Sequence, residues 1–396
     1  MLTGHSLVYF SQGPWDDLWR PQHQLMSVFA QQNKVLYVER RPYLRSTMAE
    51  FRSGELGWQD LRQPALLQVA DNLHIHRYPI WAPLSGAPAL KQLSRAAMHA
   101  SLKRSMRALD MSDPIVWYSL PSWLDLIDEL PSAQLKLYHA IDEYTSYSQM
   151  TQARIRAWEA KEQAMMAQTD AVVVVSQTLY DAKAPYNPHT YLIPNAVNYR
   201  AYEAALADPE LPPELAAIPE PRVGYIGLIG DKLNLPMLLD LARDNPQWSL
   251  VFLGSVRLPD QEALWQTLTG LPNVYHLGAV DVTRVPHYVK GFQVGLMPNL
   301  QNLFAENCSP LKLYDYLAAG IPVASIDMPH VRPFASHVQI APTPGDFQRA
   351  VRDALADRDS QRRRERREIA AQETWEARVE RLSEIIADRL AAKQAH

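Results

Sequence analysis

Short runs of apolar, mostly β-branched or aromatic residues alternate with longer amphipathic stretches along the whole chain. Such alternation is typical of strand–helix–strand units, which assemble into parallel sheets covered by helices. In the first half the expected strands are Ser6–Phe10, Val35–Val38, Pro114–Tyr118, Leu135–His139, Ala171–Val175 and Thr190–Ile193. The expected helices include Gln22–Gln31 and Thr151–Gln168. The first half is therefore predicted to form a doubly wound α/β domain.

A proline-rich stretch from Asp208 to Arg222 interrupts this pattern, and the alternation then starts again. The second series of strands is Val223–Ile226, Trp248–Leu253, Val274–Leu277, Val294–Met297 and Pro322–Ser325. The helices expected between them are Leu235–Asp244, Pro259–Leu268, Val285–Lys290 and Pro310–Ala319. The pattern thus predicts an α/β protein with two Rossmann-like domains that face each other across a cleft. We expect the first domain at residues 1–205, a linker at 206–221 and the second domain at 222–365.

The tail after Asp346 has a helical pattern and carries a dense charge run, Arg362–Arg367. We interpret this run as a solvated helix face. Apolar residues then recur at helical spacing, at Trp375, Val379, Leu382, Ile385, Ile386 and Leu390. Residues 366–396 are therefore expected to form a helix that packs back on the first domain.

Composition limits the kind of protein that this chain can be. A hydrophobic fraction of 47% and a length of 396 residues suit a globular protein with two cores. The net charge of -4 argues against a general nucleic-acid binder, which needs a basic balance. Cys308 is the only cysteine, so no intrachain disulfide can form, and a reducing, cytoplasmic location is expected. The N-terminus has no signal-peptide pattern, and no apolar run reaches the ~20 residues that span a bilayer.

The segment from Asn307 to Val323 carries the signals of a short, sharply bounded helix. Its capping signals are Ser309 at the N-cap, Pro310 at the first helical position and Gly320 at the C-terminal turn. The unpaired amides and positive dipole of such an N-terminus attract a diphosphate, and Lys312 adds a full charge. Asp315 lies on the same face, where its carboxylate can accept hydrogen bonds from ribose hydroxyls. A capped surface helix with a Lys–Asp pair explains the same residues, which alone leave both interpretations open.

Residues 309–323 resemble the donor-site helix of the large family of retaining glycosyltransferases with two Rossmann-like domains, often called family 4. Other stretches similar to the family's motifs are Ala171–Ser176 with Leu192–Asn198, Val223–Lys232 and Phe292–Pro298. The resemblance runs through most of the chain and is closest to bacterial members that build polysaccharides such as teichuronic acid. It implies a hexosyltransferase-type enzyme that moves a sugar from a nucleotide-sugar donor to a saccharide or lipid-linked acceptor. It also implies retention of configuration and no metal or other cofactor.

The resemblance assigns the grip on the donor diphosphate to residues of the second domain. A glycine-containing loop after its first strand and a basic residue just beyond would contact the diphosphate from one side, and the start of the helix would contact it from the other. The residues so implied are Gly227, Gly230, Lys232, Ser309, Leu311 and Lys312.

The family's paired-glutamate motif is altered in this chain. Asp315 stands in place of the second glutamate and, by resemblance, would bind the ribose. Asn307 stands in place of the first glutamate, with Glu306 one residue out of register. Asn307 therefore either contacts the sugar hydroxyls through neutral hydrogen bonds or marks a changed donor preference.

The acceptor-activating group is expected where a strand of the first domain ends. His139, Asp142 and Glu143 follow one another there, and related enzymes often carry a histidine in this place, which Asp142 takes in this chain. A capped loop after a strand is the plain alternative. The loop around Gly13 follows the first strand, where a glycine lets the backbone approach the donor sugar. Nearby Trp15 and Trp19 would either stack on sugar rings or lie in the core.

Competing signals are weaker. Asp357-Arg-Asp359 matches an Asp-x-Asp metal motif, but it lies in the charged tail, and we expect no metal site there. A basic helix at residues 91–107, with Leu93, Met98 and Leu102 expected on its opposite side, either docks on an anionic membrane surface or is a solvated helix. A nucleotide-sugar epimerase and a non-catalytic nucleotide-sugar-binding subunit remain alternative functions.

Overall fold

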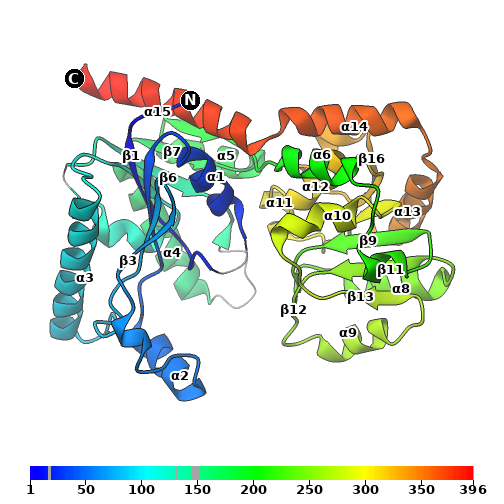
Figure 1. The fold of residues 1–396 in the computed structure, drawn as a ribbon, viewed down its shortest axis with the longest axis horizontal. Helices are drawn as coiled ribbons and strands as arrows, with labels where there is room; N and C mark the ends of the chain where they lie inside the picture. The colour runs from blue at the N-terminus through cyan, green and yellow to red at the C-terminus, as the bar shows by residue number, and fades with distance from the viewer. Residues whose placement is uncertain (17–18, 131, 145–150, 396) are drawn as a thin grey trace.

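The computed structural model describes residues 1–16, 19–130, 132–144 and 151–395. These residues form two lobes that lie side by side, each built around its own sheet (Figure 1). The last helix, drawn in red, lies along the first lobe although the chain before it belongs to the second. The α/β architecture with two Rossmann-like sheets is the one predicted from the hydrophobic pattern.

The first lobe holds an eight-stranded sheet in the order β3-β4-β2-β1-β5-β6-β7-β8. Its strands are β1 (Ser6–Phe10), β2 (Lys34–Val38), β3 (Leu66–Ala70), β4 (Leu73–His76), β5 (Ile115–Tyr118), β6 (Leu135–Ala140), β7 (Ala171–Val174) and β8 (Thr190–Leu192). All neighbours pair in parallel except β3 and β4, which form an antiparallel edge. The carboxyl ends of β1, β2, β4, β5 and β6 therefore meet at one edge, where binding sites of such sheets lie.

Helices cover both faces of this sheet, because its strands are apolar on both sides. They are α1 (Pro21–Phe29), α3 (Pro88–Ala108), α4 (Gln152–Gln168) and α5 (Gln177–Lys183), while α2 (Leu44–Ser53) projects from the lobe with only Thr47 buried (Figure 1). Met98, Leu102 and Met106 of α3 enter the core, as the pattern predicts. The expectation that Leu93 lies on the same side is wrong, because its side chain is 69% exposed near the start of the helix.

The second lobe holds a six-stranded parallel sheet in the order β13-β11-β9-β14-β15-β16. Its strands are β9 (Arg222–Ile226), β11 (Ser249–Leu253), β13 (Val274–His276), β14 (Val294–Met297), β15 (Val323–Ile326) and β16 (Val338–Ala341), with a small separate pair formed by β10 (Ile229–Gly230) and β12 (Val256–Arg257). Its helices are α7 (Pro213–Ala216), α8 (Leu235–Asp244), α9 (Glu262–Thr269), α10 (Val285–Val289), α11 (Leu303–Asn307), α12 (Leu311–Ala319), α13 (Phe347–Ala356) and α14 (Ser360–Gln372).

Helix α6 (Tyr199–Ala207) precedes the proline-rich stretch but packs against α10 and α12 of the second lobe. Val197 and Tyr202 belong to the same apolar cluster as residues of α12. The chain therefore reaches the second lobe at residue 197, ahead of the stretch expected as a linker at residues 206–221.

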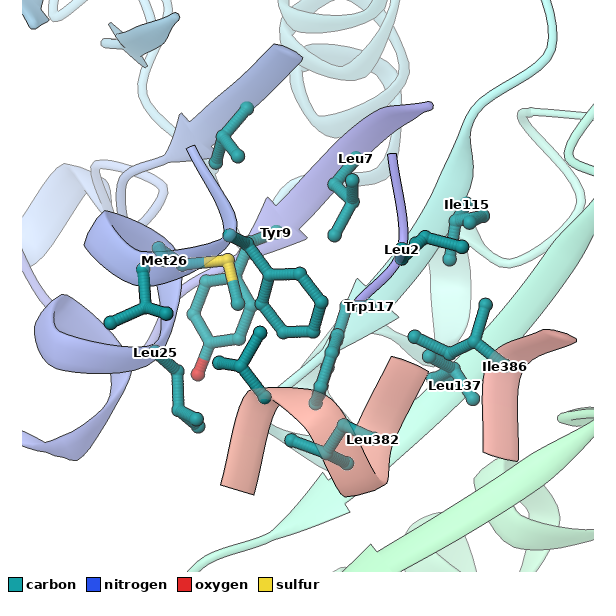
Figure 2. Close-up of a cluster of buried hydrophobic side chains, with 14 of the residues drawn as sticks. Leu2, Leu7, Tyr9, Leu25, Met26, Ile115, Trp117, Leu137, Leu382 and Ile386 are labelled. Atoms are coloured by element: carbon teal, nitrogen blue, oxygen red, sulfur yellow. The ribbon is translucent and has the colours of Figure 1, made fainter. Parts of the chain in front are cut away.

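Helix α15 (Trp375–Gln394) packs against α1 and completes the core of the first lobe. Figure 2 shows Leu382 and Ile386 of α15 pointing toward Trp117 and Leu137 of the sheet. All of these side chains are buried, so the helix contributes to the core and does not merely lie on its surface. The predicted return of the C-terminal helix to the first domain is confirmed.

The charge run Arg362–Arg367, which precedes α15, was expected to be a solvated helix face, and it is so only in part. Arg366 is 2% exposed, pairs with Asp357 and donates to the carbonyl oxygen of Gly320 over 3.4 Å. Gly320 ends α12 with a φ of 73° and lies under α14, where an added Cβ would meet Arg363. A buried arginine at the crossing of α12 and α14 is stable because the carboxylate and carbonyl satisfy its donors.

Candidate functional site

The glycine loop after β9 and the start of α12 lie beside each other. Gly227 has a φ of 108°, a conformation that favours glycine, and a Cβ built on it would lie 4.0 Å from Cε of Lys312. The carbonyl oxygen of Gly227 packs closely against Gly254, and a Cβ on Gly254 would clash with that oxygen. Gly230 follows in β10, which pairs with β12. The loop and the helix therefore form one site within the second lobe.

Lys232 and Lys312 place their ammonium groups in the same region. Nζ of Lys232 lies 3.3 Å from the ring centroid of Phe304, and Nζ of Lys312 lies 4.9 Å from that of Tyr225. Burial lowers the pKa of Lys232, and the nearby charge of Lys312 lowers it further. The two ammonium groups repel each other, so the site favours an anion that neutralises both charges.

Helix α12 begins one residue later than the capping pattern predicts. Pro310 occupies the N-cap position and Leu311 begins the helix, so the assignment of Ser309 as N-cap is wrong. The Ser309 hydroxyl instead accepts a hydrogen bond from the backbone amide of Asn195 over 3.1 Å, and the Asn195 side chain donates to the Ser309 carbonyl over 2.7 Å. A residue of the first lobe thus uses the hydroxyl that would otherwise cap the helix. The first-turn amides of Leu311 and Lys312 still start the helix, as required for an anion site.

Asp315 lies one turn into α12 and is held by a tyrosine from α6. The Tyr202 hydroxyl donates to Oδ1 of Asp315 over 3.0 Å. Burial raises the pKa of Asp315 to about 6, whereas the bond from Tyr202 and the charge of Lys312 act in the opposite direction. Sequence reasoning did not identify Tyr202, because nothing in the pattern indicates that α6 packs against α12. The pair fixes one carboxylate oxygen and leaves the other to accept a hydroxyl.

The structure resolves the register of the altered glutamate motif. Asn307 is 4% exposed, and its amide donates to the Leu303 carbonyl over 2.7 Å. Glu306 points the other way, into an open hollow between the lobes whose lining includes Thr178 and Arg332. Glu306 therefore does not replace the missing glutamate, and the inward position is held by the neutral amide of Asn307.

Asp142 follows β6 in the first lobe and faces the cations of the second. Its charge raises the pKa of Lys232 against the effect of burial, and it also acts on the thiol of Cys308. Cys308 is itself an unreactive thiol here, because burial raises its pKa to about 11. Arg20, just before α1, contributes a further positive charge near Lys232. Groups from both lobes thus meet at one place.

Glu143 has a different environment from its neighbour. Its carboxylate lies 3.3 Å from Nζ of Lys183, which also lies 2.8 Å from the carboxylate of Glu162. Tyr138 donates a hydrogen bond to Glu162 over 2.7 Å. Although burial disfavours the charge, the two carboxylates raise the pKa of Lys183. Glu143 therefore belongs to a mostly buried ion network that ties α4 and α5 to the sheet.

His139 is buried in β6 with its ring 5.7 Å from that of Trp117. Among the described residues, neither of its ring nitrogens has a hydrogen-bond partner. Burial lowers its pKa to about 3, so the ring is neutral at physiological pH. These surroundings favour a packing role for His139 over the acceptor activation proposed from the sequence.

The loop around Gly13 is fixed by local hydrogen bonds. The Ser11 hydroxyl donates to the Gly13 carbonyl over 2.9 Å and accepts from its amide over 3.1 Å. Trp15 is buried with its ring 5.0 Å from that of Tyr37, so it lies in the core. Trp19 is 36% exposed and stacks on His23, which makes it the tryptophan of this loop that can reach a ligand.

Within the described ranges, no group of three or more His, Cys, Asp or Glu side chains is arranged to hold a metal ion. Asp357 of the Asp-x-Asp motif pairs with Arg366 and lies 3.7 Å from Arg362. Two guanidinium groups thus already neutralise that carboxylate. No described helix combines the length and the apolar character needed to cross a bilayer.

Comparison with known proteins agrees with this geometry. A family described as "Glycosyl transferase-like" matches residues 236–384, which include α12. The putative teichuronic acid biosynthesis glycosyltransferase TuaH of Bacillus subtilis is 26% identical over 281 residues, which is 66% of this chain and 68% of that protein. The chain is a glycosyltransferase of the GT-B type.

Solved structures share the fold of this glycosyltransferase over almost the whole chain. Sucrose-phosphate synthase from Thermosynechococcus elongatus is 17% identical, with a TM-score of 0.69 over 98% of this chain and 100% of that one. The Anabaena protein HepE in complex with UDP-glucose is 14% identical, with a TM-score of 0.66 over 97% of this chain and 99% of that one. At these identities the likeness shows the fold alone.

Proposed function

We propose that this glycosyltransferase takes its sugar from a nucleotide-sugar donor bound by the second lobe. The observation that carries the proposal is the meeting of Lys232, Lys312 and the start of α12, opposite Asp142 of the first lobe. Two ammonium groups and the positive end of a helix suit a diphosphate, because each stabilises negative charge. The complex of HepE with UDP-glucose supports a nucleotide sugar as the class of donor.

In the proposed reaction the bond between the sugar's anomeric carbon and the diphosphate breaks, and a bond from that carbon to an acceptor oxygen forms on the same face. The acceptor proton passes to an oxygen of the leaving diphosphate, so configuration is retained. Lys232, Lys312 and the amides of Leu311 and Lys312 stabilise the charge that develops on the diphosphate. Asp315 binds the ribose, and Asn307 contacts the sugar through neutral hydrogen bonds.

Asp142 orients the acceptor hydroxyl for this transfer. The charge of this first-lobe residue acts on Lys232 of the second lobe, which supports the role. The acceptor is proposed to be a saccharide or a lipid-linked saccharide of bacterial polysaccharide or glycoconjugate biosynthesis, in line with the name of the teichuronic acid relative. We further propose a cytoplasmic enzyme that works at the inner face of the membrane and needs no metal.

A screen of nucleotide sugars by thermal shift and by hydrolysis tests the donor. We expect at least one nucleotide sugar to stabilise the wild type, and Lys312→Ala to weaken its binding by ~10- to 100-fold, since a charge-assisted contact contributes about 1.5–3 kcal/mol. Asp315→Ala should weaken it less, and Lys161→Ala, an exposed lysine of α4, serves as the control. Stabilisation by no nucleotide, or equal stabilisation of all variants, would contradict the proposal.

Product analysis separates this reaction from its alternatives. An epimerase changes the sugar of the donor with no acceptor present, whereas a transferase releases nucleotide diphosphate and needs an acceptor for efficient turnover. A non-catalytic binding subunit binds the donor and leaves it unchanged.

A further inference from the structure

The first lobe exposes an unusual concentration of large apolar side chains. Trp58 is 83% exposed and Trp81 is 64% exposed, values that are costly for side chains of this size in water. Four aliphatic side chains between residues 44 and 93 accompany them. Together they form what we term the tryptophan patch: Leu44, Met48, Trp58, Trp81, Leu90 and Leu93.

Backbone contacts bring the segments of the tryptophan patch together. The amide of Leu44, at the start of α2, donates to the carbonyl of Leu84 over 2.9 Å. Ser94 of α3 donates to the carbonyl of Pro83 over 2.9 Å. The segment that carries Trp81 therefore lies between the starts of α2 and α3. Trp58 joins them through Phe51 of α2, whose ring centroid lies 6.1 Å from its own.

The topology of the sheet places this patch on the same side as the candidate acceptor site. Helix α2 follows the carboxyl end of β2, and the segment with Trp81 follows the carboxyl end of β4. The loop around Gly13 follows β1 and Asp142 follows β6, which run parallel to β2 and β4 in the same sheet. In Figure 1, α2 projects from the first lobe on the side away from α15.

Basic residues outnumber acidic ones around the patch although the chain as a whole is acidic. Between residues 40 and 95 there are eight Lys or Arg residues and four Asp or Glu residues, in a protein of net charge -4. Three of the cations pair with carboxylates outside this stretch, namely Arg41, Arg77 and Arg95. Arg45 and Arg52 of α2 and Lys91 of α3 are exposed. Exposed tryptophans flanked by cations match the interface of an anionic bilayer, where the rings lie among headgroups and the cations face lipid phosphates.

We propose that the tryptophan patch docks the enzyme on an anionic lipid bilayer, with Trp58 and Trp81 inserted at headgroup level. A second copy of the chain fits the surface less well, because a symmetric contact would bring its own cations face to face. This surface extends the basic helix expected at residues 91–107 to α2 and the segment before α3. In α3 itself, the guanidinium of Arg95 forms a salt bridge with Glu129 over 2.7 Å, so it is less available to lipid phosphates than Arg45, Arg52 and Lys91.

Vesicle flotation tests the docking surface. The wild type is expected to float with vesicles of phosphatidylcholine containing roughly one third phosphatidylglycerol, and to bind pure phosphatidylcholine vesicles much more weakly. The double variant Trp58→Ser/Trp81→Ser should lose ~10-fold or more of this binding, because both rings leave the interface. The matched control Tyr186→Ser/Val282→Ser removes exposed apolar side chains elsewhere and should bind as the wild type does.

Two further measurements make the result decisive. Arg45→Glu/Lys91→Glu should weaken binding to anionic vesicles, and high salt should reduce the difference from the wild type. Equal flotation of the wild type and the tryptophan variant, or a dimer that the tryptophan substitutions abolish, would overturn the proposal. Docking does not depend on the donor chemistry, so nucleotide-sugar thermal shifts of the same variants should match the wild type and report separately on the proposed function.

Discussion

The two lobes contribute to the site between them in different ways. In the second lobe the residues implied in donor binding converge, with Lys312 against Gly227 and Asp315 one turn further along α12. In the first lobe the three neighbouring candidates diverge. His139 is buried, Glu143 pairs with Lys183, and Asp142 faces the cations of the other lobe.

The difference follows from how each lobe builds its half. The proposed donor half is a glycine loop and one helix whose spacing fixes which side chains share a face, so a short motif specifies most of it. The proposed acceptor half consists of loops after several strands. His139 still belongs to β6 whereas Asp142 and Glu143 follow it in a loop, so these neighbours have different surroundings. A motif thus predicts donor chemistry better than acceptor chemistry.

The largest expected effect comes from the ion network of the first lobe. Lys183→Ala leaves the carboxylates of Glu162 and Glu143 buried without their cation, which should lower the free energy of unfolding by about 3–5 kcal/mol. Urea unfolding measures this loss, with Lys161→Ala as the exposed control. Nucleotide-sugar affinity of the folded variant should not change, because the donor half lies in the other lobe. A stability within error of the wild type would show that the network is not structural.

Asp142→Asn should reduce turnover while sparing the donor. Loss of the carboxylate should lower acceptor-dependent transfer by ~100-fold, because the acceptor hydroxyl is then no longer held in position for transfer. The affinity for a nucleotide sugar should stay the same or rise slightly, because a negative charge near Lys232 is removed. Steady-state kinetics and titration calorimetry measure the two effects.

The control for this variant is Asp128→Asn, which changes a 90% exposed carboxylate of the same lobe. Full transfer activity in Asp142→Asn would remove this residue from the mechanism.

The smallest expected effect is a pH dependence of donor binding. In the proposed site the Asp315 carboxylate accepts hydrogen bonds from ribose more strongly when it is ionised, and burial raises its pKa to about 6. Nucleotide-sugar affinity should therefore be highest above pH 7 and fall by up to ~10-fold as pH drops one unit below this pKa. Calorimetric titrations across this range measure the change. Asp315→Asn should bind more weakly and lose this dependence, whereas an unchanged pH profile would assign it to another group.

Much of the fold could be predicted because most strands are apolar on both faces. The expected strands Ser6–Phe10 and Val294–Met297 and the helix Leu235–Asp244 have the predicted bounds. Strands β3 and β16 were missed because they are partly exposed edge strands, and the interior strand β4 (LHIH) was missed because its four-residue run contains two histidines. The apolar pattern of a segment indicates how deeply it is buried, and edge strands are less buried than central ones.

The candidate site was predictable only where its contacts are local. Lys312 and Asp315 share a helix, so their spacing fixes their relation. Ser309 was misassigned because Asn195, distant in sequence, takes its hydroxyl. The partnership of Tyr202 with Asp315 and the burial of His139 likewise depend on long-range packing, which no local pattern encodes.

The two passages of the chain between the lobes lie together. The amide of Val197, where the chain leaves the first lobe, donates to the carbonyl of Glu373, where it returns, over 2.9 Å. These two crossings are the covalent links between the lobes, so any rotation of one lobe against the other would bend the chain here. Joined crossings oppose separation of the lobes more than rotation, so such a rotation would carry Asp142 along an arc relative to the second lobe.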